Sequence, residues 1–414
     1  MIKVITYGTF DLLHYGHIRL LERAKALGDY LIVGITSDDY DKTRGKINNR
    51  QSLMERVEAV KSTGIADKVI VEEYDGQKID DIKKYGIDIF TVGSDWEGKF
   101  DYLNTYCKVV YLQRTEGVSS SNIRSESRKI RIGILSDTKA SEKFIEESKY
   151  VNGIFADYCN SDMDDCDAVY VVTDPEKRYE DVKKALNKGK NVLCEGPVTI
   201  NAEKCKELFN IAREKKLVLV PSIKTAYFTG FNRLILLAES GKIGDIVSVD
   251  STCTSLRKGK KSLFSWGPIA LLPVFSLLGT NYRSKHIVSK SFNSKREIDG
   301  FTKIDFTYDN AVASIKVANE AKSEGELIIT GTKGYIYVPS PWWKTDYFEL
   351  RYENTAENRR FFYQLDGEGI RYEIAAFANQ IEHGHNAGYL SNDIVVGISK
   401  IMEDYSKGKD LTAI

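Results

Sequence analysis

The stretch Val4-Ile5-Thr6-Tyr7-Gly8-Thr9-Phe10-Asp11-Leu12-Leu13-His14-Tyr15-Gly16-His17 decides the fold of the first part of the chain. It begins as a β-rich run, breaks at Gly8 and leads into a helical pattern from Ile18 to Leu27. In α/β sheets, phosphates bind at such strand-to-helix turns, because the first N–H groups of a helix have no partner within it. The stretch therefore predicts a parallel sheet with a phosphate site at this turn.

His14 and His17 fall at the expected start of that helix. Two imidazoles there can donate hydrogen bonds to a triphosphate as charge develops on the departing pyrophosphate. A histidine pair with this spacing can also simply cap a helix or fill a partly buried slot. A second cluster, behind the apolar run Val109–Leu112, favours the phosphate interpretation, because it supplies a guanidinium, hydroxyls and a glycine turn. Its members are Arg114, Thr115, Gly117, Ser119, Ser120 and Ser121.

The two clusters together resemble the motifs of the cytidylyltransferase family. The motifs are Gly-Thr-Phe-Asp at residue 8, His-x-Gly-His at residue 14 and Arg-Thr-x-Gly-x-Ser at residue 114, and the likeness covers residues 1 to about 124. The resemblance implies that an acceptor phosphate attacks the α-phosphorus of CTP, with Mg²⁺ bound and no side-chain nucleophile. It implies catalytic roles for His14, His17, Lys46 and Arg114. The nucleotide-binding residues that it implies are Gly8, Thr9, Phe10, Asp11, Gly16, Asp95, Thr115, Gly117, Ser119, Ser120 and Ser121.

Basic residues are the candidates for binding the acceptor substrate. The loop Asp41–Lys46 is polar, and such a charge run is as often an ordinary solvated surface. The resemblance implies instead that Arg44 and Lys78 contact the acceptor phosphate and that Lys46 contacts CTP. Family members have lysine in place of Arg44, a change that keeps the charge and suits a phosphate. The implied acceptor is a small polyol phosphate, first of all glycerol 3-phosphate, giving CDP-glycerol for teichoic acid or capsule synthesis.

Regular patterns connect these motifs. Tyr30–Ile35 is a continuous apolar run, as expected for a strand covered on both faces. Ser52–Thr63 predicts a helix with Val57 turned inward and Arg56 on its basic outer face.

Composition limits what the whole chain can be. Its 414 residues are enough for two to three domains. The 59 basic and 59 acidic residues balance, so neither nucleic acid nor an anionic membrane is expected as a partner. Six scattered cysteines without a Cys-x-x-Cys pair indicate neither zinc nor a disulfide framework, and we expect no metal-ligating residues. No apolar run is long enough to span a membrane, so we expect a cytoplasmic protein.

A second series of strands and helices begins at Arg131, after the polar segment Ser119–Lys129. The run Gly189–Pro197 and the later Gly241–Ile246 and Ile329–Gly334 resemble the glucose-fructose oxidoreductase and inositol dehydrogenase family. We therefore expect an α/β protein with three domains. They are a Rossmann-like nucleotidyltransferase sheet at 1–129, a degenerate dinucleotide-binding-like Rossmann domain at 130–225 and an α+β domain with an antiparallel sheet at 226–414.

The residues of oxidoreductase chemistry are largely replaced. The dinucleotide fingerprint needs glycines, and Ser136–Ala140 has none. The short interval from Ser148 to Val169 predicts that the second strand and its ribose-binding carboxylate are lost. Gly196 stands where the resemblance implies a lysine, and the run Gly267–Ser276 is apolar where it implies an acid and a histidine. The sequence thus predicts against NAD(P) as a cofactor and against hydride transfer.

Two hypotheses remain for the second half of the chain. In the first, it is a non-catalytic module that assembles the protein or docks a later enzyme, and the resemblance implies a homodimer formed through an aromatic-rich sheet around Trp342 and Tyr347. In the alternative, the enzyme is bifunctional, and the second half is an NAD(P)-dependent reductase that supplies the polyol. Nicotinamide binding separates the two hypotheses.

Overall fold

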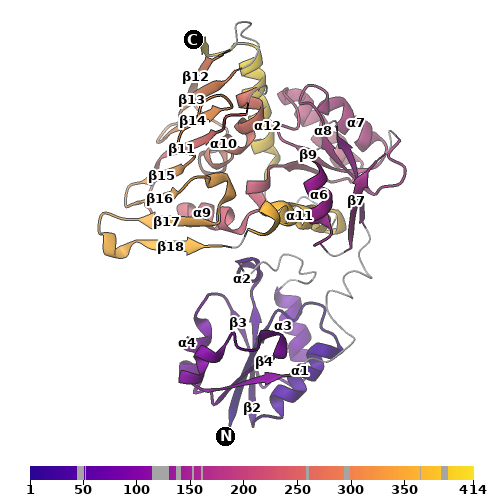
Figure 1. Ribbon diagram of the computed structural model, residues 1–414, viewed down its shortest axis with the longest axis vertical. Helices are drawn as coiled ribbons and strands as arrows, with labels where there is room; N and C mark the ends of the chain where they lie inside the picture. The colour runs from indigo at the N-terminus through magenta and orange to yellow at the C-terminus, as the bar shows by residue number, and fades with distance from the viewer. Residues whose placement is uncertain are drawn as a thin grey trace. The chain divides into compact units, whose positions relative to one another are not determined.

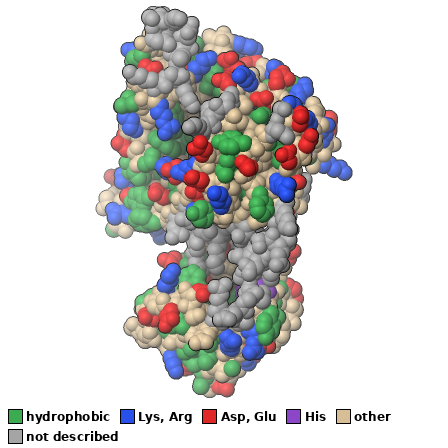
Figure 2. All heavy atoms as spheres, turned by 45° about the vertical axis from the view of Figure 1, so that its right-hand side comes forward, with side chains coloured by type: hydrophobic (Ala, Val, Ile, Leu, Met, Phe, Trp, Pro, Cys, Tyr) green, Lys and Arg blue, Asp and Glu red, His purple; other side chains and the backbone are tan. Residues whose placement is uncertain are grey.

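The computed structural model describes residues 1–43, 51, 53–113, 130–136, 141–151, 153–159, 162–257, 261–292, 299–363, 365–383 and 390–414. The chain divides into two compact units, residues 1–129 and 130–414, called here the first and the second unit. On the face that Figure 2 shows, basic and acidic side chains are interspersed, in keeping with the balanced charge. None of the helices described is both long and apolar enough to cross a membrane.

The first unit is built on a five-stranded parallel sheet, which confirms the predicted fold class (Figure 1). Its strands, in the order β3-β2-β1-β4-β5, are β1 (Lys3–Gly8), β2 (Tyr30–Thr36), β3 (Lys68–Glu72), β4 (Ile89–Gly93) and β5 (Lys108–Leu112). Its helices are α1 (Tyr15–Lys25), α2 (Asp38–Thr43), α3 (Leu53–Ser62) and α4 (Gln77–Tyr85), with 3₁₀ turns η1 (Ser94–Trp96) and η2 (Asp101–Thr105).

Two apolar cores cover the two faces of this sheet. One packs Val4, Leu31 and Val33 against Leu21 of α1, and the other packs Ile5 and its neighbours against Ile82 of α4 and Leu103 of η2. The strand order reverses between β1 and β4, so their carboxyl ends diverge there and leave a crevice in which α/β sheets bind ligands.

The second unit begins with another five-stranded parallel sheet, in the order β10-β9-β8-β6-β7. The strands are β6 (Ile130–Ser136), β7 (Ile154–Tyr158), β8 (Ala168–Val172), β9 (Asn191–Glu195) and β10 (Leu219–Ser222), and the helices are α6 (Glu142–Ser148), α7 (Arg178–Asn187) and α8 (Ala202–Glu214). The order reverses between β6 and β8, so this sheet too has a ligand-binding crevice at its carboxyl edge.

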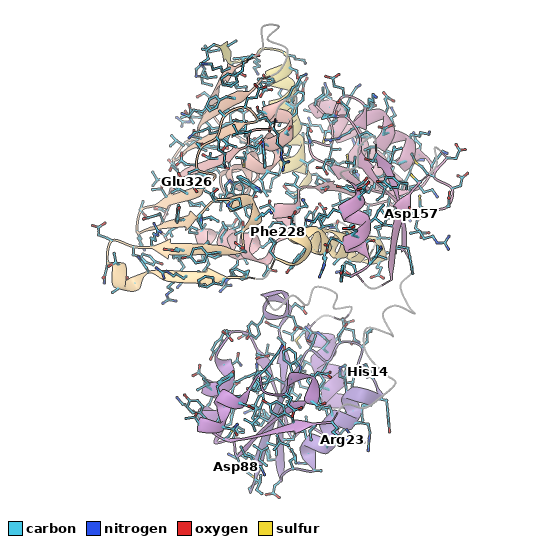
Figure 3. The ribbon with its side chains drawn as sticks, in the orientation of Figure 1. His14, Arg23, Asp88, Asp157, Phe228 and Glu326 are labelled. Atoms are coloured by element: carbon cyan, nitrogen blue, oxygen red, sulfur yellow. The ribbon has the colours of Figure 1, made fainter. Side chains whose placement is uncertain are left out.

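The strand β7 corrects the prediction that the second strand is lost. It pairs with β6 in parallel, from Ile130 opposite Ile154 to Ile134 opposite Tyr158. The interval has room for it because α6 has only seven residues. The strand gives a weak hydrophobic signal because it lies at the sheet edge, where Ile154 is buried and Asp157 is exposed (Figure 3).

A nine-stranded sheet follows, in the order β18-β17-β16-β15-β11-β14-β13-β12-β19. It is mostly antiparallel, as predicted, with two parallel pairs, β11 with β14 and β12 with β19. The strands are β11 (Ile246–Thr254), β12 (Ser284–Lys290), β13 (Phe301–Thr307), β14 (Val312–Ala318), β15 (Leu327–Gly331), β16 (Tyr335–Val338), β17 (Tyr347–Arg351), β18 (Arg359–Phe362) and β19 (Leu411–Ala413).

Helices join this sheet to the parallel one. The apolar helix α10 (Ser262–Leu278) packs on β11 and β14, next to α9 (Thr229–Glu239). The last helices return to the parallel sheet: α11 (Ile370–His383) packs on α6, and α12 (Asn392–Ser406) packs on α8. The division of this unit at residue 225 therefore stays a prediction, since residues beyond it help to cover the first sheet.

Candidate active site and dinucleotide-binding fold

The two predicted histidines lie side by side at the start of α1, where Figure 3 labels His14. Their ring centroids are 3.9 Å apart and the ring planes differ by 20°. His14 also caps the helix, because its Nδ1 accepts a hydrogen bond from the backbone N–H of Gly16 at 3.1 Å. A neutral His14 ring that accepts at Nδ1 carries its proton on Nε2, which can donate to a ligand. Capping and anion binding are thus compatible here.

The turn before His14 is held in a strained backbone conformation. Phe10 and Leu12 have φ of 53° and 48°, in the left-handed region that side chains other than glycine rarely adopt. Gln51 fixes this turn through two hydrogen bonds. The Gln51 N–H donates to the Asp11 carboxylate at 3.0 Å, and the Leu12 N–H donates to Gln51 Oε1 at 2.8 Å. Strain of this kind persists where surrounding contacts impose it, often at functional sites.

Arg56 is the residue that the sequence analysis placed wrongly. Its side chain is fully buried rather than on an outer basic face. Its guanidinium donates to the carbonyl oxygens of Thr9 at 2.7 Å and Thr36 at 2.9 Å; Thr9 directly follows β1 and Thr36 ends β2. It also pairs with Asp38, and Asp41 Oδ2 lies 3.8 Å away. Arg56 therefore ties the carboxyl ends of two strands to α2.

Lys78, predicted to contact the acceptor phosphate, has a buried carboxylate as its neighbour. Its ammonium pairs with Glu72, which is fully buried and also accepts from Thr36 Oγ1 at 2.9 Å. The ammonium lies 4.8 Å from the centre of the Tyr7 ring. Burial raises the pKa of Tyr7, with the charge of Asp81 adding to the rise. The phenol is thus neutral and donates to Asp81 at 2.9 Å.

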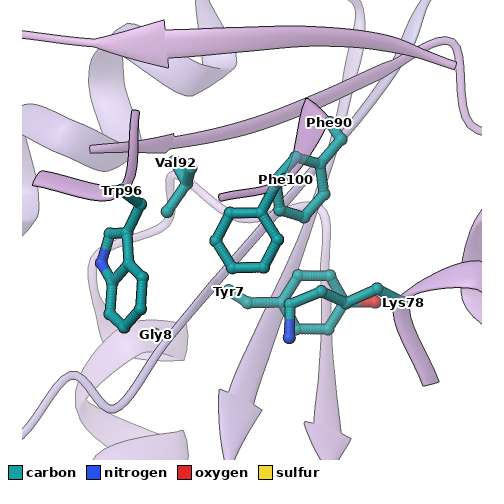
Figure 4. Close-up of a pocket in the computed structure, with 7 residues that line it drawn as sticks. All are labelled: Tyr7, Gly8, Lys78, Phe90, Val92, Trp96 and Phe100. Carbon is teal, nitrogen blue, oxygen red and sulfur yellow. The ribbon is translucent and has the colours of Figure 1, made fainter. Parts of the chain in front are cut away.

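A small pocket lies at the carboxyl ends of β1 and β4, at the reversal of strand order (Figure 4). It is lined by Tyr7, Gly8, Lys78, Phe90, Val92, Trp96 and Phe100. Its walls are aromatic, and the Lys78 ammonium is the charged group that lines it. Asp95 is exposed in η1, next to Trp96.

The remaining predicted site residues lie outside the described residues, and their roles stay predictions. They are Arg44, Lys46, Arg114, Thr115, Gly117, Ser119, Ser120 and Ser121. The predicted loop at Asp41–Lys46 is corrected in its first part, where Asp41–Thr43 end the short helix α2.

In the second unit, the position of Gly196 is tightly packed. A Cβ there would lie 3.1 Å from Pro268 Cβ and 3.3 Å from Ile223 Cγ1. Arg178 ties the neighbouring strand ends together, since it donates to the carbonyl oxygens of Thr173 at 2.7 Å and Pro197 at 2.9 Å. The carboxyl edge at β8 and β9 is thus tightly ordered, without the lysine that the resemblance implies.

Comparison with known proteins bears on the first unit. The family model described as cytidylyltransferase-like matches residues 5–126. The glycerol-3-phosphate cytidylyltransferase of Bacillus spizizenii is 50% identical over 126 residues, which are 30% of this chain and 97% of that protein. The chain belongs to the glycerol-3-phosphate cytidylyltransferase family. The resemblance expected from the motifs is confirmed, and the first unit is called the cytidylyltransferase unit below.

The second unit matches a different group. The family model described as oxidoreductase family, NAD-binding Rossmann fold, matches residues 119–222. The 3-ketoreductase KijD10 of Actinomadura kijaniata, solved with NADP and TDP-benzene, has a TM-score of 0.60 at 16% identity, over 69% of this chain and all of that chain. An oxidoreductase of Agrobacterium radiobacter, solved with NAD⁺, L-tartaric acid and magnesium, has a TM-score of 0.58 at 14% identity, over 67% of this chain and 96% of that chain. The solved structures show the fold of the second unit.

The match to the NAD-binding Rossmann fold contradicts the prediction against NAD(P) in the second unit, and the prediction against oxidoreductase activity is not supported. Both predictions rested on replaced residues at a few positions. The fold that carries a dinucleotide is nevertheless present, with β7 in place and the strand order reversing between β6 and β8. Of the five residues expected to obstruct the pyrophosphate, Ser136 is within the described chain, and residues 137–140 are outside it.

Proposed function

We propose that the chain is bifunctional. The cytidylyltransferase unit makes CDP-glycerol and pyrophosphate from CTP and glycerol 3-phosphate with Mg²⁺, and the second unit is an NAD(P)-dependent oxidoreductase. The stacked pair of His14 and His17 at the start of α1 carries the first part of the proposal. The identity of 50% to a glycerol-3-phosphate cytidylyltransferase supports the choice of acceptor. The product would serve a teichoic acid or capsule polymer.

The proposed transfer needs positioning and charge neutralisation. An oxygen of the acceptor phosphate forms a bond to the α-phosphorus of CTP, the bond to the bridging oxygen breaks, and pyrophosphate leaves with the electron pair. His14 Nε2, His17 and the N–H groups at the start of α1 face the charge that develops. Arg56 holds the turn that carries them. The pocket beside Trp96 and Phe100 would take the polyol, with Lys78 near its phosphate.

Pyrophosphate release by the purified full chain tests this activity. With CTP, Mg²⁺ and glycerol 3-phosphate, His17→Ala should reduce the rate at least about a hundredfold, because one preoriented donor to the developing charge is lost. His286→Ala is the control, since His286 is in the second unit on β12 and bonds Thr412. An unchanged rate in His17→Ala would contradict the proposed site.

The second activity is supported by the fold and by an observation at the carboxyl edge of its parallel sheet. The buried carboxyl group of Glu373 interacts with Ser222 and Glu195 at this edge, and neither of its oxygens has a hydrogen bond of ordinary geometry among the described residues. NAD(P)H would supply the hydride there and leave as NAD(P)⁺. Reduction of a small sugar or triose would give the polyol that the other unit uses once it is phosphorylated. Oxidation of NADPH or NADH by a panel of small sugars and trioses tests this, and no turnover with any of them would contradict it.

A further inference from the structure

A buried acid in the second unit lacks a structural partner. Glu373 lies on α11 and is 1% exposed. Within the described part of the chain, neither of its carboxylate oxygens has a hydrogen bond of ordinary geometry, although the Ser222 hydroxyl is near enough to act on the group. Leaving a buried polar group unpaired is costly, and such groups are retained at positions where their chemistry is used. Glu373 therefore needs an explanation beyond packing.

The groups that face Glu373 come from the ends of three neighbouring strands. Tyr170 of β8 donates from its hydroxyl to Glu195 Oε2 at 2.8 Å, and Glu195 is the last residue of β9. Ser222, the last residue of β10, has its Oγ 3.4 Å from both the Tyr170 hydroxyl and Glu195 Oε2. The partly exposed Lys224 follows in the 3₁₀ turn η4 (Lys224–Tyr227). Among the described residues, the charged groups that act on Glu373 are the Glu195 carboxylate and the Lys224 ammonium.

The charge state of Glu373 follows from this setting. Burial raises the pKa of its carboxyl group to about 8; the charge of Glu195 adds to the rise, while Lys224 and the Ser222 hydroxyl oppose it. The group is therefore mostly protonated at neutral pH. Nearby, the Phe144 ring of α6 stacks on the Tyr170 ring, with centroids 4.3 Å apart.

The cluster lies in the half of the sheet where a bound dinucleotide would place its nicotinamide. A dinucleotide spans the two halves that meet at the reversal of strand order, and the ribose-binding acid of the adenosine follows the second strand. The adenosine half is therefore β6 with β7. The other half, β8 with β9 and β10, carries Tyr170, Glu195 and Ser222 at or near its carboxyl ends.

We propose that Glu373 is the proton store of this site: it gives up its proton when the positively charged ring of NAD(P)⁺ binds and keeps it when NAD(P)H binds. This inference rests on the proposed NAD(P) binding of the second unit. The proton leaves toward solvent past Lys224, and the carboxylate that remains balances the ring's charge. In the reducing direction, the carbonyl carbon of the substrate gains a hydride and its oxygen gains one proton. Glu373, which is already protonated, is the source of that proton.

Proton release on binding tests the inference without a substrate. The full chain is titrated calorimetrically at pH 7 with the oxidised and reduced forms of whichever of NAD and NADP binds more tightly, in two buffers of different ionisation enthalpy. We expect the oxidised form to release about half a proton or more per chain, and the reduced form to release none. Glu373→Gln should abolish the release and leave binding in place.

Two further variants and one measurement make the test specific. Lys224→Met removes the positive charge that lowers the pKa of Glu373, so the release should shift to higher pH. Glu203→Gln, an exposed acid on α8, should release as many protons as the unaltered chain. Glu373→Gln should melt no lower than the unaltered chain, whereas a structural acid would lose stability.

The outcomes separate this inference from the proposed function. If the oxidised dinucleotide binds and Glu373→Gln releases as many protons as the unaltered chain, including none, the inference is overturned and the proposed function stands. If neither dinucleotide binds, the proposed function fails and the inference fails with it.

Discussion

The two parallel sheets of this chain both have five strands and a reversal of strand order, but they differ in their strand order and in the polar groups at their carboxyl edges. In the cytidylyltransferase unit the edge is closed by charged groups that satisfy one another, with Arg56 bound to Thr9, Thr36 and Asp38. In the second unit the residues expected for hydride chemistry are replaced, and the edge holds Glu373 without a hydrogen bond of ordinary geometry among the described residues. The hydrophobic pattern that forms the sheet can thus be kept while the polar residues of the site are replaced.

The largest effect is expected from a substitution that breaks the hydrogen-bond network of Arg56 in the cytidylyltransferase unit. Arg56→Met should destabilise the cytidylyltransferase unit by about 3–5 kcal/mol, because it removes the guanidinium beside the buried Asp41 carboxylate and the donor to two strand-end carbonyls. Urea denaturation followed by fluorescence measures this, with Arg23→Met as the control, because the hydrogen bond that the half-buried Arg23 of α1 donates to the Gln113 carbonyl is exposed. A loss below about 1 kcal/mol would show that the network does not hold this edge together.

In the second unit, replacing the buried Glu373 is expected to raise stability rather than lower it. The pKa of the Glu373 carboxyl group is about 8 in the folded chain, against an ordinary value of 4.5. Unfolding therefore releases its proton between these pH values, and the folded state loses stability as pH rises through this window. Glu373→Gln should stabilise the second unit by about 2 kcal/mol or more near pH 9 and by almost nothing near pH 4. Chemical denaturation at both pH values checks this, and a destabilised variant at the higher pH would contradict it.

A smaller effect concerns the acceptor. Lys78→Met should raise the KM for glycerol 3-phosphate about tenfold or more and leave the KM for CTP nearly unchanged, because it removes a contact to one substrate. The double variant with Glu72→Gln avoids leaving a buried carboxylate alone. Lys83→Met, exposed on the same helix, is the control. A change in the KM for CTP alone would place Lys78 in the nucleotide site.

The smallest effect concerns assembly through the nine-stranded sheet. On β16, Ile336 and Val338 are buried, while Tyr335 and Tyr337 face the other way with Arg351 beside them, its guanidinium 4.4 Å from the Tyr337 ring. We expect this aromatic face to form a dimer. Light scattering should show a dimer that Tyr337→Asp converts to monomers without loss of pyrophosphate release. A monomeric unaltered chain would contradict this prediction.

The sequence predicted the elements with a strong period and the residues in long motifs. His14, His17 and the parallel strands around them were found because a strand, a glycine break and a helix follow one another within a few residues. The strand β7 was missed because an edge strand buries few side chains. The roles of Arg44, Lys46 and Arg114 rest on the family resemblance, and these residues lie outside the described residues.

The burial of Arg56 and Glu373 was also not predicted, although their spacing in the sequence indicates it. Arg56 comes three residues after Leu53 and four before Val60, on the apolar face of α3. Glu373 comes three residues after Ile370 and four before Phe377, on the apolar face of α11. A charge at such spacing is enclosed by the same packing as its apolar neighbours. The spacing does not predict which groups a buried charge will bind. For Arg56, those groups come from other elements of the fold.

The most direct test of two active units in one chain is a calorimetric titration of the full protein with NADPH or NADH, followed in the same cell by CTP with Mg²⁺. The account predicts that one of the reduced dinucleotides binds with micromolar affinity, and that CTP then binds with the same affinity as it shows alone. Binding of CTP together with no binding of either dinucleotide up to millimolar concentration would contradict the account, and would leave the second unit as a fold without its cofactor.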